Sequence, residues 1–288
     1  MNLSGTGESL TLENGQDLTV EGGSGNTITL GTGSSSDTIN FIAGTNTVNL
    51  TSAQLSSQTI GGGTGIDTIK VTDSSATIAD GDFLRVTGVE TLQLTGTSTV
   101  TLDTNAKTAG IANVTTGNGA TSLTTTATGP TSLSINATAL ADNAALTLVG
   151  PSADTVTGLI GDIAASSLTG ALTVTTGDAT DNTISITTGS AATSITASGA
   201  GDTIAVDATA LANNTALTLA GSAAEVVSGL IGNIAAGSLT GALTVMTADN
   251  TVDDGIAITI GSAATSISGS GAGDTISVDA TALERFHV

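Results

Sequence analysis

The sequence predicts an all-β protein, an elongated parallel β-solenoid (a β-helix or β-roll) with repeats of about 71 residues. Three observations lead to this fold class: long internal repeats, short runs of alternating apolar and hydroxyl-bearing residues, and glycine-rich turns between those runs. Repetition at a fixed period is typical of solenoids, in which each repeat packs mainly against its neighbours.

The internal repeats are near-identical over long stretches. The segment GLIGDIAASSLTGALTV at 158–174 returns as GLIGNIAAGSLTGALTV at 229–245, a period of 71 residues. We divide the chain into a Gly/Asp-rich segment resembling a β-solenoid (1–105), a transition segment (106–134) and a tandem-repeat region (135–288). The copies in the last region start near 135, 206 and 278, and the final copy reads as truncated.

Strand-like runs recur within each repeat. Alternation with a period of two places Ile, Val and Leu on one face of a strand and hydroxyls on the other. The runs are Ala171–Thr175, Thr183–Thr187, Thr193–Ala197, Thr203–Asp207 and Ala216–Leu219. We expect roughly three coils of two strands in each repeat. We expect little helix; the best candidate for one short turn or capping helix is around Ile160–Leu168, where Ala and Leu gather.

The composition predicts a thin core without covalent cross-links. Aromatic residues make up 1% of the chain, whereas 39% of its residues are apolar, so neither a thick aromatic core nor a disordered polar tail is expected. The chain has no Cys and therefore no disulfide. It has no apolar stretch long enough to insert in a membrane. Its first residues, MNLSGTGESL, do not resemble a Sec signal peptide.

The charge balance is strongly acidic. The chain has 25 Asp and Glu residues against 4 Lys and Arg, a net charge of −21. Such a surface repels nucleic acid and anionic lipid, and it attracts cations. We expect most carboxylates to be solvated surface groups and a few, at repeated positions in turns, to bind metal.

One turn carries a complete calcium-type motif. Residues 62–70, GGTGIDTIK, fit the pattern G-G-x-G-x-D-x-U-x, in which glycines permit a tight turn and Asp completes an oxygen cage. The segment resembles the RTX calcium-binding nonapeptide family, whose repeats stack into a parallel β-roll. The resemblance implies that calcium is the cofactor and that Gly63, Gly65 and Asp67 carry its ligands.

Other turns keep only part of the motif. An Asp before a Thr-Ile pair recurs at Asp37, Asp202 and Asp274, which we take as further candidate calcium ligands. A weaker match ends at Asp154. The alternative for each is an ordinary Asp that caps a turn.

A second resemblance lies at 78–102, IADGDFLRVTGVETLQLTGTSTVTL. This stretch is similar to solenoid segments of bacterial S-layer proteins and related large surface adhesins. The resemblance implies calcium-dependent folding and assembly at the cell surface. On this reading Phe83 fills the core, and Val89, Leu92 and Leu94 line it.

Catalysis finds little support in the sequence. The only histidine is His287, beside the end of the sequence, and there is no Cys, so a Ser-His-Asp triad and thiol chemistry are nearly excluded. We therefore expect a non-enzymatic, extracellular structural protein (an S-layer, surface filament or adhesin stalk) that is stabilised by calcium and assembles with copies of itself. Two alternatives stay open: a module that binds ice or cell-surface polysaccharide through Thr-rich sheet faces, and, less favoured, a carbohydrate-active β-helix enzyme.

Overall fold

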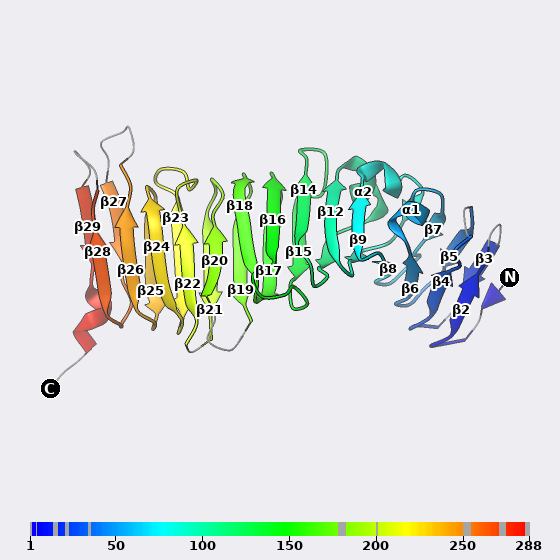
Figure 1. Ribbon diagram of the computed structural model, residues 1–288, viewed down its shortest axis with the longest axis horizontal. Coiled ribbons are helices and arrows are strands. Elements are labelled where there is room, and N and C mark those ends of the chain that lie inside the picture. The colour runs from blue at the N-terminus through cyan, green and yellow to red at the C-terminus, as the bar shows by residue number, and fades with distance from the viewer. Residues whose placement is uncertain are drawn as a thin grey trace. The chain divides into compact units, whose positions relative to one another are not determined.

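The computed structural model describes residues 2–3, 5–13, 17–20, 23–33, 36–177, 183–199, 201–249, 255–270 and 275–285. It is a parallel β-solenoid of about 12 turns with about 21 residues per turn, which confirms the predicted fold class (Figure 1). The chain divides into an N-terminal unit, Met1–Ala139, and a C-terminal unit, Leu140–Val288. The helices among the described residues are too short and too polar to cross a membrane.

The strands of the N-terminal unit form three parallel sheets. Sheet A contains β1 (Asn2–Leu3), β3 (Asp17–Val20), β5 (Thr38–Phe41), β7 (Thr59–Gly61) and β10 (Val86–Thr87). Sheet B contains β2 (Ser9–Leu12), β4 (Thr27–Leu30), β6 (Thr47–Leu50), β8 (Thr68–Val71), β11 (Thr91–Gln93), β13 (Asn113–Thr115) and β15 (Ser132–Asn136). Sheet C contains β9 (Ser75–Ile78), β12 (Thr97–Leu102) and β14 (Thr121–Thr125).

Three short helices interrupt the turns of this unit: α1 (Ser52–Leu55), the 3-10 helix η1 (Asp80–Phe83) and α2 (Thr104–Ala109). Thr51 and Gln54 form a capping box at the start of α1. Asp80 caps α2, because its Oδ1 accepts hydrogen bonds from the N–H of Asp103 (2.8 Å) and of Ala106 (2.9 Å). The sequence analysis predicted none of these helices.

The core of the N-terminal unit contains the side chains that the sequence placed there. Phe83 is 1% exposed, and Val89, Leu92 and Leu94 are buried with it. Phe83 ends η1, so this helix anchors a turn in the core. The prediction that these four residues fill or line the core is confirmed.

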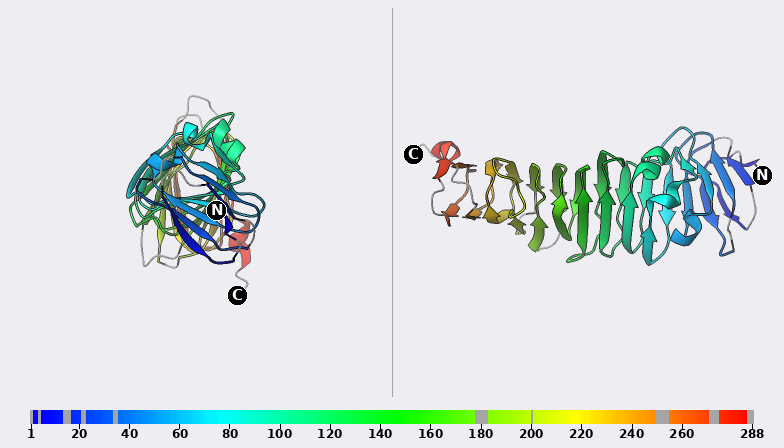
Figure 2. Two further views of the ribbon diagram at one scale, coloured as in Figure 1. Left: turned by 90° about the vertical axis from the view of Figure 1, so that its right-hand side faces the viewer. Right: turned by 90° about the horizontal axis from the view of Figure 1, so that it is seen from above.

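The C-terminal unit has two strands in each coil, one in each of two sheets. Figure 2 shows its coils as successive layers. The even sheet contains β16 (Ala145–Gly150), β18 (Asp162–Leu168), β20 (Thr183–Thr187), β22 (Thr203–Asp207), β24 (Ala224–Leu230), β26 (Leu243–Thr247) and β28 (Thr265–Ser268). The odd sheet contains β17 (Ala153–Leu159), β19 (Leu172–Thr176), β21 (Thr193–Ala197), β23 (Ala216–Gly221), β25 (Asn233–Leu239), β27 (Gly255–Thr259) and β29 (Thr275–Asp279). The 3-10 helix η2 (Thr281–Arg285) follows.

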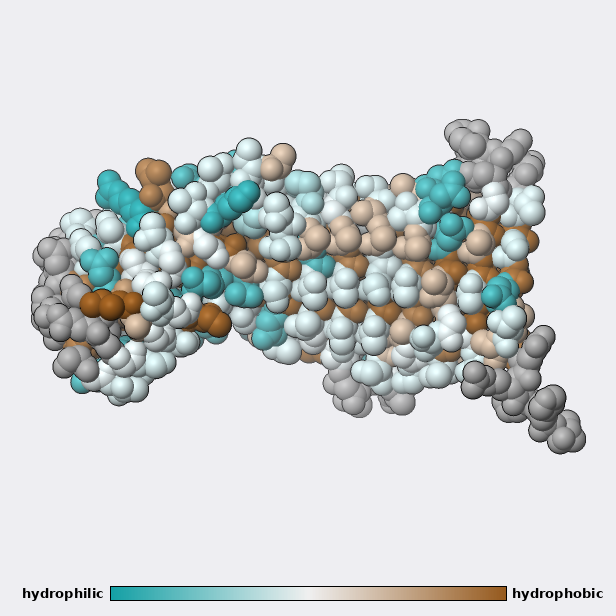
Figure 3. Space-filling model, turned by 180° about the vertical axis from the view of Figure 1, so that it is seen from behind, coloured by the Kyte–Doolittle hydropathy of each residue, from teal (hydrophilic) through white to brown (hydrophobic). Residues whose placement is uncertain are grey.

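Inside this unit, like residues stack on like residues from coil to coil. Ile184 of β20 pairs in register with Ile204 of β22, and Ile186 pairs with Val206. All four side chains are at most 1% exposed. Parallel strands stack at about 4.8 Å, so β-branched side chains in register fill a narrow interior. Figure 3 shows the outer surface, where pale hydroxyl-rich rows alternate with apolar rows.

The predicted helix around Ile160–Leu168 is wrong, because this segment forms strand β18. Ile163, Ala165 and Leu168 are buried, and β18 pairs with β16 and β20 on its two sides. Ala has a high helix propensity. Here its small side chain instead fits an inward position of a thin core, and pairing with neighbouring strands overrides the local preference.

The 71-residue repeat contains seven strands, not the six expected for three coils. The counterpart of β18 one repeat later is β25, and that of β20 is β27. Seven is odd and each coil has two strands, so corresponding strands of successive copies lie in opposite sheets. β18 and β20 belong to the even sheet, whereas β25 and β27 belong to the odd sheet.

Close backbone stacking explains a column of glycines in the N-terminal unit. A Cβ on Gly44 would overlap the carbonyl oxygen of Gly23, and a Cβ on Gly65 would overlap that of Gly44. Both residues have positive φ, +91° and +142°. Only glycine meets both conditions without strain. The preceding coil therefore fixes the residue type at these turns.

We expect Gly44→Ala to lower the free energy of unfolding of the N-terminal unit by about 2–4 kcal/mol, through strain at positive φ and overlap with Gly23. Thermal unfolding followed by circular dichroism measures the change. Gly81→Ala is the matched control, because a Cβ on Gly81 meets nothing within 4 Å and its φ is not positive. Equal stability of the two variants would contradict the stacking argument.

Candidate functional site

A ladder of polar side chains runs through the turns that precede the strands of sheet B. Its members are Asn26, Asn46, Asp67 and Glu90, which lie directly before β4, β6, β8 and β11. Asn26 donates from Nδ2 to Asn46 Oδ1 (3.1 Å), and Asn46 donates from Nδ2 to Asp67 Oδ1 (3.1 Å). The N–H of Asp67 donates to Glu90 Oε2 (2.9 Å). Each rung thus holds the backbone or side chain of the coil before it.

Asp67, the central residue of the predicted calcium motif, is therefore a rung of this ladder. It is 1% exposed. Its Oδ1 also accepts from the backbone N–H of Asn46 at 2.8 Å. Its Oδ2 is buried and has no hydrogen-bond partner. One carboxylate oxygen thus serves coil stacking, and the other remains unsatisfied at substantial free-energy cost.

The surroundings of Asp67 disfavour its charge. Burial raises the pKa of the Asp67 carboxyl above its ordinary value, and the Glu90 carboxylate nearby adds to that rise. The two hydrogen bonds from Asn46 act in the opposite direction, because they stabilise the ionised form. A proton or a cation at Oδ2 would relieve the unfavourable charge.

The oxygens around Asp67 suit a hard cation in kind but not in number. A Cβ built on Gly62 would meet both Gly88 O and Asp67 Oδ2, so these two oxygens lie on the same side of Gly62. Calcium takes six to eight oxygen ligands. However, Asp67 Oδ1 and Glu90 Oε2 already accept hydrogen bonds. Nowhere in the described part of the chain do three or more Asp, Glu or His side chains gather as a metal site would require.

The two glycines predicted as calcium ligands have a structural role that requires no metal. A Cβ on Gly63 would overlap the carbonyl oxygens of Phe41 and Ile42, and Gly65 belongs to the stacked column above Gly44. The motif at 62–70 is thus accounted for by the close approach of coils and by the polar ladder. Calcium binding at Gly63, Gly65 and Asp67 stays a prediction.

Two of the remaining candidate calcium ligands, Asp37 and Asp202, lie in turns before other strands. Asp37 is buried before β5 of sheet A, and its N–H donates to Gln58 Oε1 at 2.6 Å. Asp202 is buried before β22 in the C-terminal unit, where its carbonyl accepts from the N–H of Ala224 at 3.1 Å. Asp274 lies outside the described residues.

Two further buried carboxyls occupy equivalent positions of the repeat. Asp154 of β17 and Glu225 of β24 are 71 residues apart and are 3% and 1% exposed. Neither Glu225 carboxyl oxygen has a hydrogen-bond partner, nor does Asp154 Oδ1. Glu225 pairs in register with Ile204 and Leu243, which places it in an apolar row. An acid at an apolar position of the alternating pattern, as in Ala-Glu-Val-Val, is the sequence signal that identifies it.

Burial changes the protonation of these two groups. It raises the pKa of Glu225 from 4.5 to about 8 and that of Asp154 from 3.8 to about 6, although a hydrogen bond from Ser152 partly lowers the latter. Glu225 is thus mainly a neutral acid at pH 7. Among the described residues, neither carboxyl belongs to a group of three or more His, Asp or Glu side chains that could hold a metal ion.

No protein-family model matches the chain, and no curated protein or solved structure matches it. The fold and the side-chain geometry therefore carry the functional argument.

We expect Asp67→Asn to retain or raise stability in chelator at pH 7. The new amide keeps an oxygen for Asn46 and places a donor near Gly88 O, where Asp67 has an unsatisfied oxygen. Thermal unfolding in EDTA measures this, and Glu13→Gln, at an exposed position of the same unit, controls for the loss of one negative charge.

The same two variants, unfolded with calcium present, test the metal. If calcium stabilises the wild type and Glu13→Gln but not Asp67→Asn, Asp67 is a ligand. A loss of more than about 1 kcal/mol by Asp67→Asn in EDTA would contradict the ladder role.

Glu225 makes stability depend on pH. A raised pKa in the folded state means that stability is greatest below 4.5 and is lost as pH rises through about 8. The full loss is on the order of 5 kcal/mol. We expect Glu225→Gln to flatten the decline in urea-denaturation free energy between these pH values. Asp249→Asn, at an exposed position, should leave the wild-type slope unchanged, and identical slopes for all three proteins would contradict the assignment.

Proposed function

We propose that this protein is a structural, self-assembling protein of the cell surface, a segment of an S-layer, surface filament or adhesin stalk, and that it is not an enzyme. The observation that carries the proposal is that the repeated residues form the core of the solenoid. Each 71-residue copy contains seven strands. Their apolar side chains lie inside the solenoid and stack from coil to coil, as Ile184 stacks on Ile204. The repeated residues build a body and do not converge on a site.

The repeat architecture supports a role in spanning distance. Each coil of a solenoid contacts mainly the coils beside it, so copies can be added without redesign of the core. Corresponding stretches such as 158–174 and 229–245 differ at two positions over 17 residues. Such close repetition suits a protein that functions by spanning a distance.

The carboxylates support the calcium part of the proposal. A net charge of −21 opposes close approach of two copies, and divalent cations reduce that repulsion. Asp67 offers a buried oxygen without a partner. We propose that calcium stabilises folding or assembly, which fits an extracellular location, where this ion is abundant. Copies of the same chain are the principal partners.

The test is assembly of the purified chain in calcium and in EGTA, followed by sedimentation velocity and electron microscopy. We expect ordered oligomers or fibres in calcium at physiological ionic strength and smaller species in EGTA. Assembly that is equal in both conditions would refute the calcium part only. A monomer at all concentrations and in both conditions would refute the structural, self-assembling role.

A further inference from the structure

The outer face of sheet B in the N-terminal unit has an unusually uniform chemistry. Strand pairing aligns its outward side chains in two rows, each crossing seven strands. The first row is Ser9, Thr27, Thr47, Thr68, Thr91, Asn113 and Ser134. The second row is Thr11, Thr29, Asn49, Lys70, Gln93, Thr115 and Asn136.

Every side chain in these two rows is able to form hydrogen bonds, and none is acidic or apolar. Lys70 is the one charged residue among them. All fourteen side chains are exposed or half-buried. Because these rows contain no carboxylate, a ligand that covers them does not have to remove water from a negative charge. The hydroxyls and amides can each donate and accept hydrogen bonds.

The odd sheet of the C-terminal unit provides a comparison within the same molecule. Its aligned outward row is also rich in hydroxyls but includes one apolar and one acidic side chain. The row is Thr155, Thr173, Ser194, Thr218, Ala235, Thr259 and Asp279. A strand needs no uniform polar row in order to fold. The uniformity of sheet B in the N-terminal unit therefore calls for another explanation.

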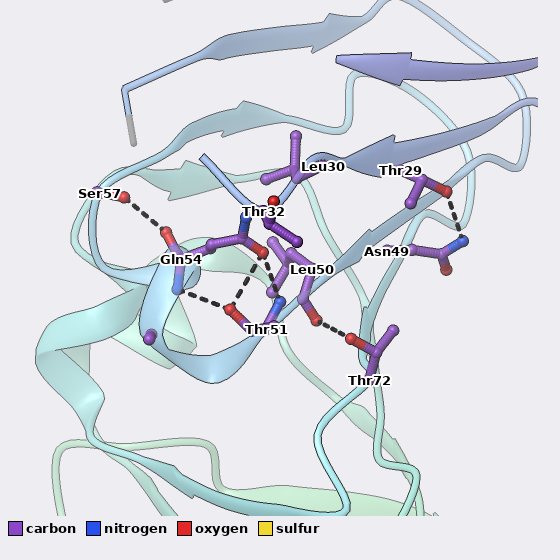
Figure 4. A pocket seen from close by; sticks show the side chains of 10 residues that line it. Thr29, Leu30, Thr32, Asn49, Leu50, Thr51, Gln54, Ser57 and Thr72 are labelled. Atoms are coloured by element: carbon purple, nitrogen blue, oxygen red, sulfur yellow. Dashed lines mark hydrogen bonds between the residues drawn. The ribbon is translucent and has the colours of Figure 1, made fainter. Parts of the chain in front are cut away.

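A hollow of about 510 Å³ adjoins the second row, between the ends of β4 and β6 and helix α1 (Figure 4). Thr29 and Asn49 belong to both the row and the hollow. Asn49 Nδ2 donates to Thr29 Oγ1 at 3.1 Å, which leaves the Thr29 hydroxyl hydrogen for another acceptor. Asn49 Oδ1 has no hydrogen-bond partner.

The opposite wall of the hollow is held in place by its own hydrogen bonds. Gln54 Oε1 accepts from the N–H of Thr51 at 2.9 Å, and Gln54 Nε2 donates to Gly31 O at 2.7 Å. The Thr72 hydroxyl donates to Leu50 O at 3.1 Å. Because these bonds preform the hollow, its walls lose little freedom when it is filled, which favours binding.

We propose that these two rows and the hollow bind a neutral polysaccharide. A sugar polymer presents hydroxyl groups along an extended chain, and the rows present matching donors and acceptors at about 4.8 Å intervals. The hollow accommodates a sugar ring beside Thr29 and Asn49. The net charge of −21 disfavours polyanions. Lys70, Gln93 and the hollow break the flat, uniform surface that contact with ice requires. This binding function is independent of the structural role above.

Retardation in native gels that contain hydroxyethylcellulose, laminarin, dextran or galactomannan tests the proposal. We expect at least one of these neutral polymers to retard the wild type. The variant Asn49→Ala/Gln93→Ala removes two row side chains and should weaken retardation roughly ten-fold, about the worth of two hydrogen bonds. Thr173→Ala/Thr196→Ala, two exposed hydroxyls of the odd sheet, is the matched control and should match the wild type.

Three results would overturn the proposal. The first is a wild type that none of the four neutral polymers retards, including the case of ice-recrystallisation inhibition alone. The second is equal retardation of both double variants. The third is stronger retardation by alginate that Lys70→Glu abolishes, which would assign the face to an anionic polymer. Sedimentation of the same variants keeps this result separate from assembly, because the row substitutions should leave assembly unchanged.

Discussion

The stacking of one coil on the next at backbone hydrogen-bonding distance is the constraint on which the rest of this structure depends. At that spacing each residue's environment is set by the residue about 21 positions away. Inward positions accept only side chains that pack on themselves, as Ile184 does on Ile204. Turn positions such as Gly44 lie so close to the neighbouring backbone that no Cβ fits. The short repertoire of residue types in the sequence follows from this constraint.

Polar groups inside the stack obey the same constraint but satisfy it unequally. Asn46 is suited to its place, because an amide can accept from one coil and donate to the next. Asp67 can only accept when ionised, and it therefore interrupts the chain of donors. Glu225 has neither a partner nor solvent, so it remains largely protonated. The interior thus contains both an ordered polar ladder and isolated acids that reduce stability at high pH.

The sequence predicts the strands well and their partners poorly. The alternation at Thr183–Thr187, Thr193–Ala197 and Thr203–Asp207 predicts three strands with the bounds that the structure gives them. The helix predicted around Ile160–Leu168 was wrong, because Ala favours a helix locally and only pairing with the neighbouring strands makes this segment a strand. The role of Asp67 needed knowledge of which residue lies one coil away. The available sequence signal was a common pattern, an Asn, Asp or Glu followed by Thr and an apolar residue. It occurs at Asn26, Asn46, Asp67 and Glu90.

The odd number of strands in the repeat has a geometric consequence for any surface feature that the repeat encodes. Successive copies are related by a half-turn about the coil axis as well as by a translation, which is a two-fold screw operation. A group on the outer face of β18 points away from one side of the C-terminal unit, and its counterpart on β25 points away from the other. A contact encoded once in the repeat is therefore offered in two opposite directions. Side-by-side association through such a contact extends in a plane and does not close into a pair.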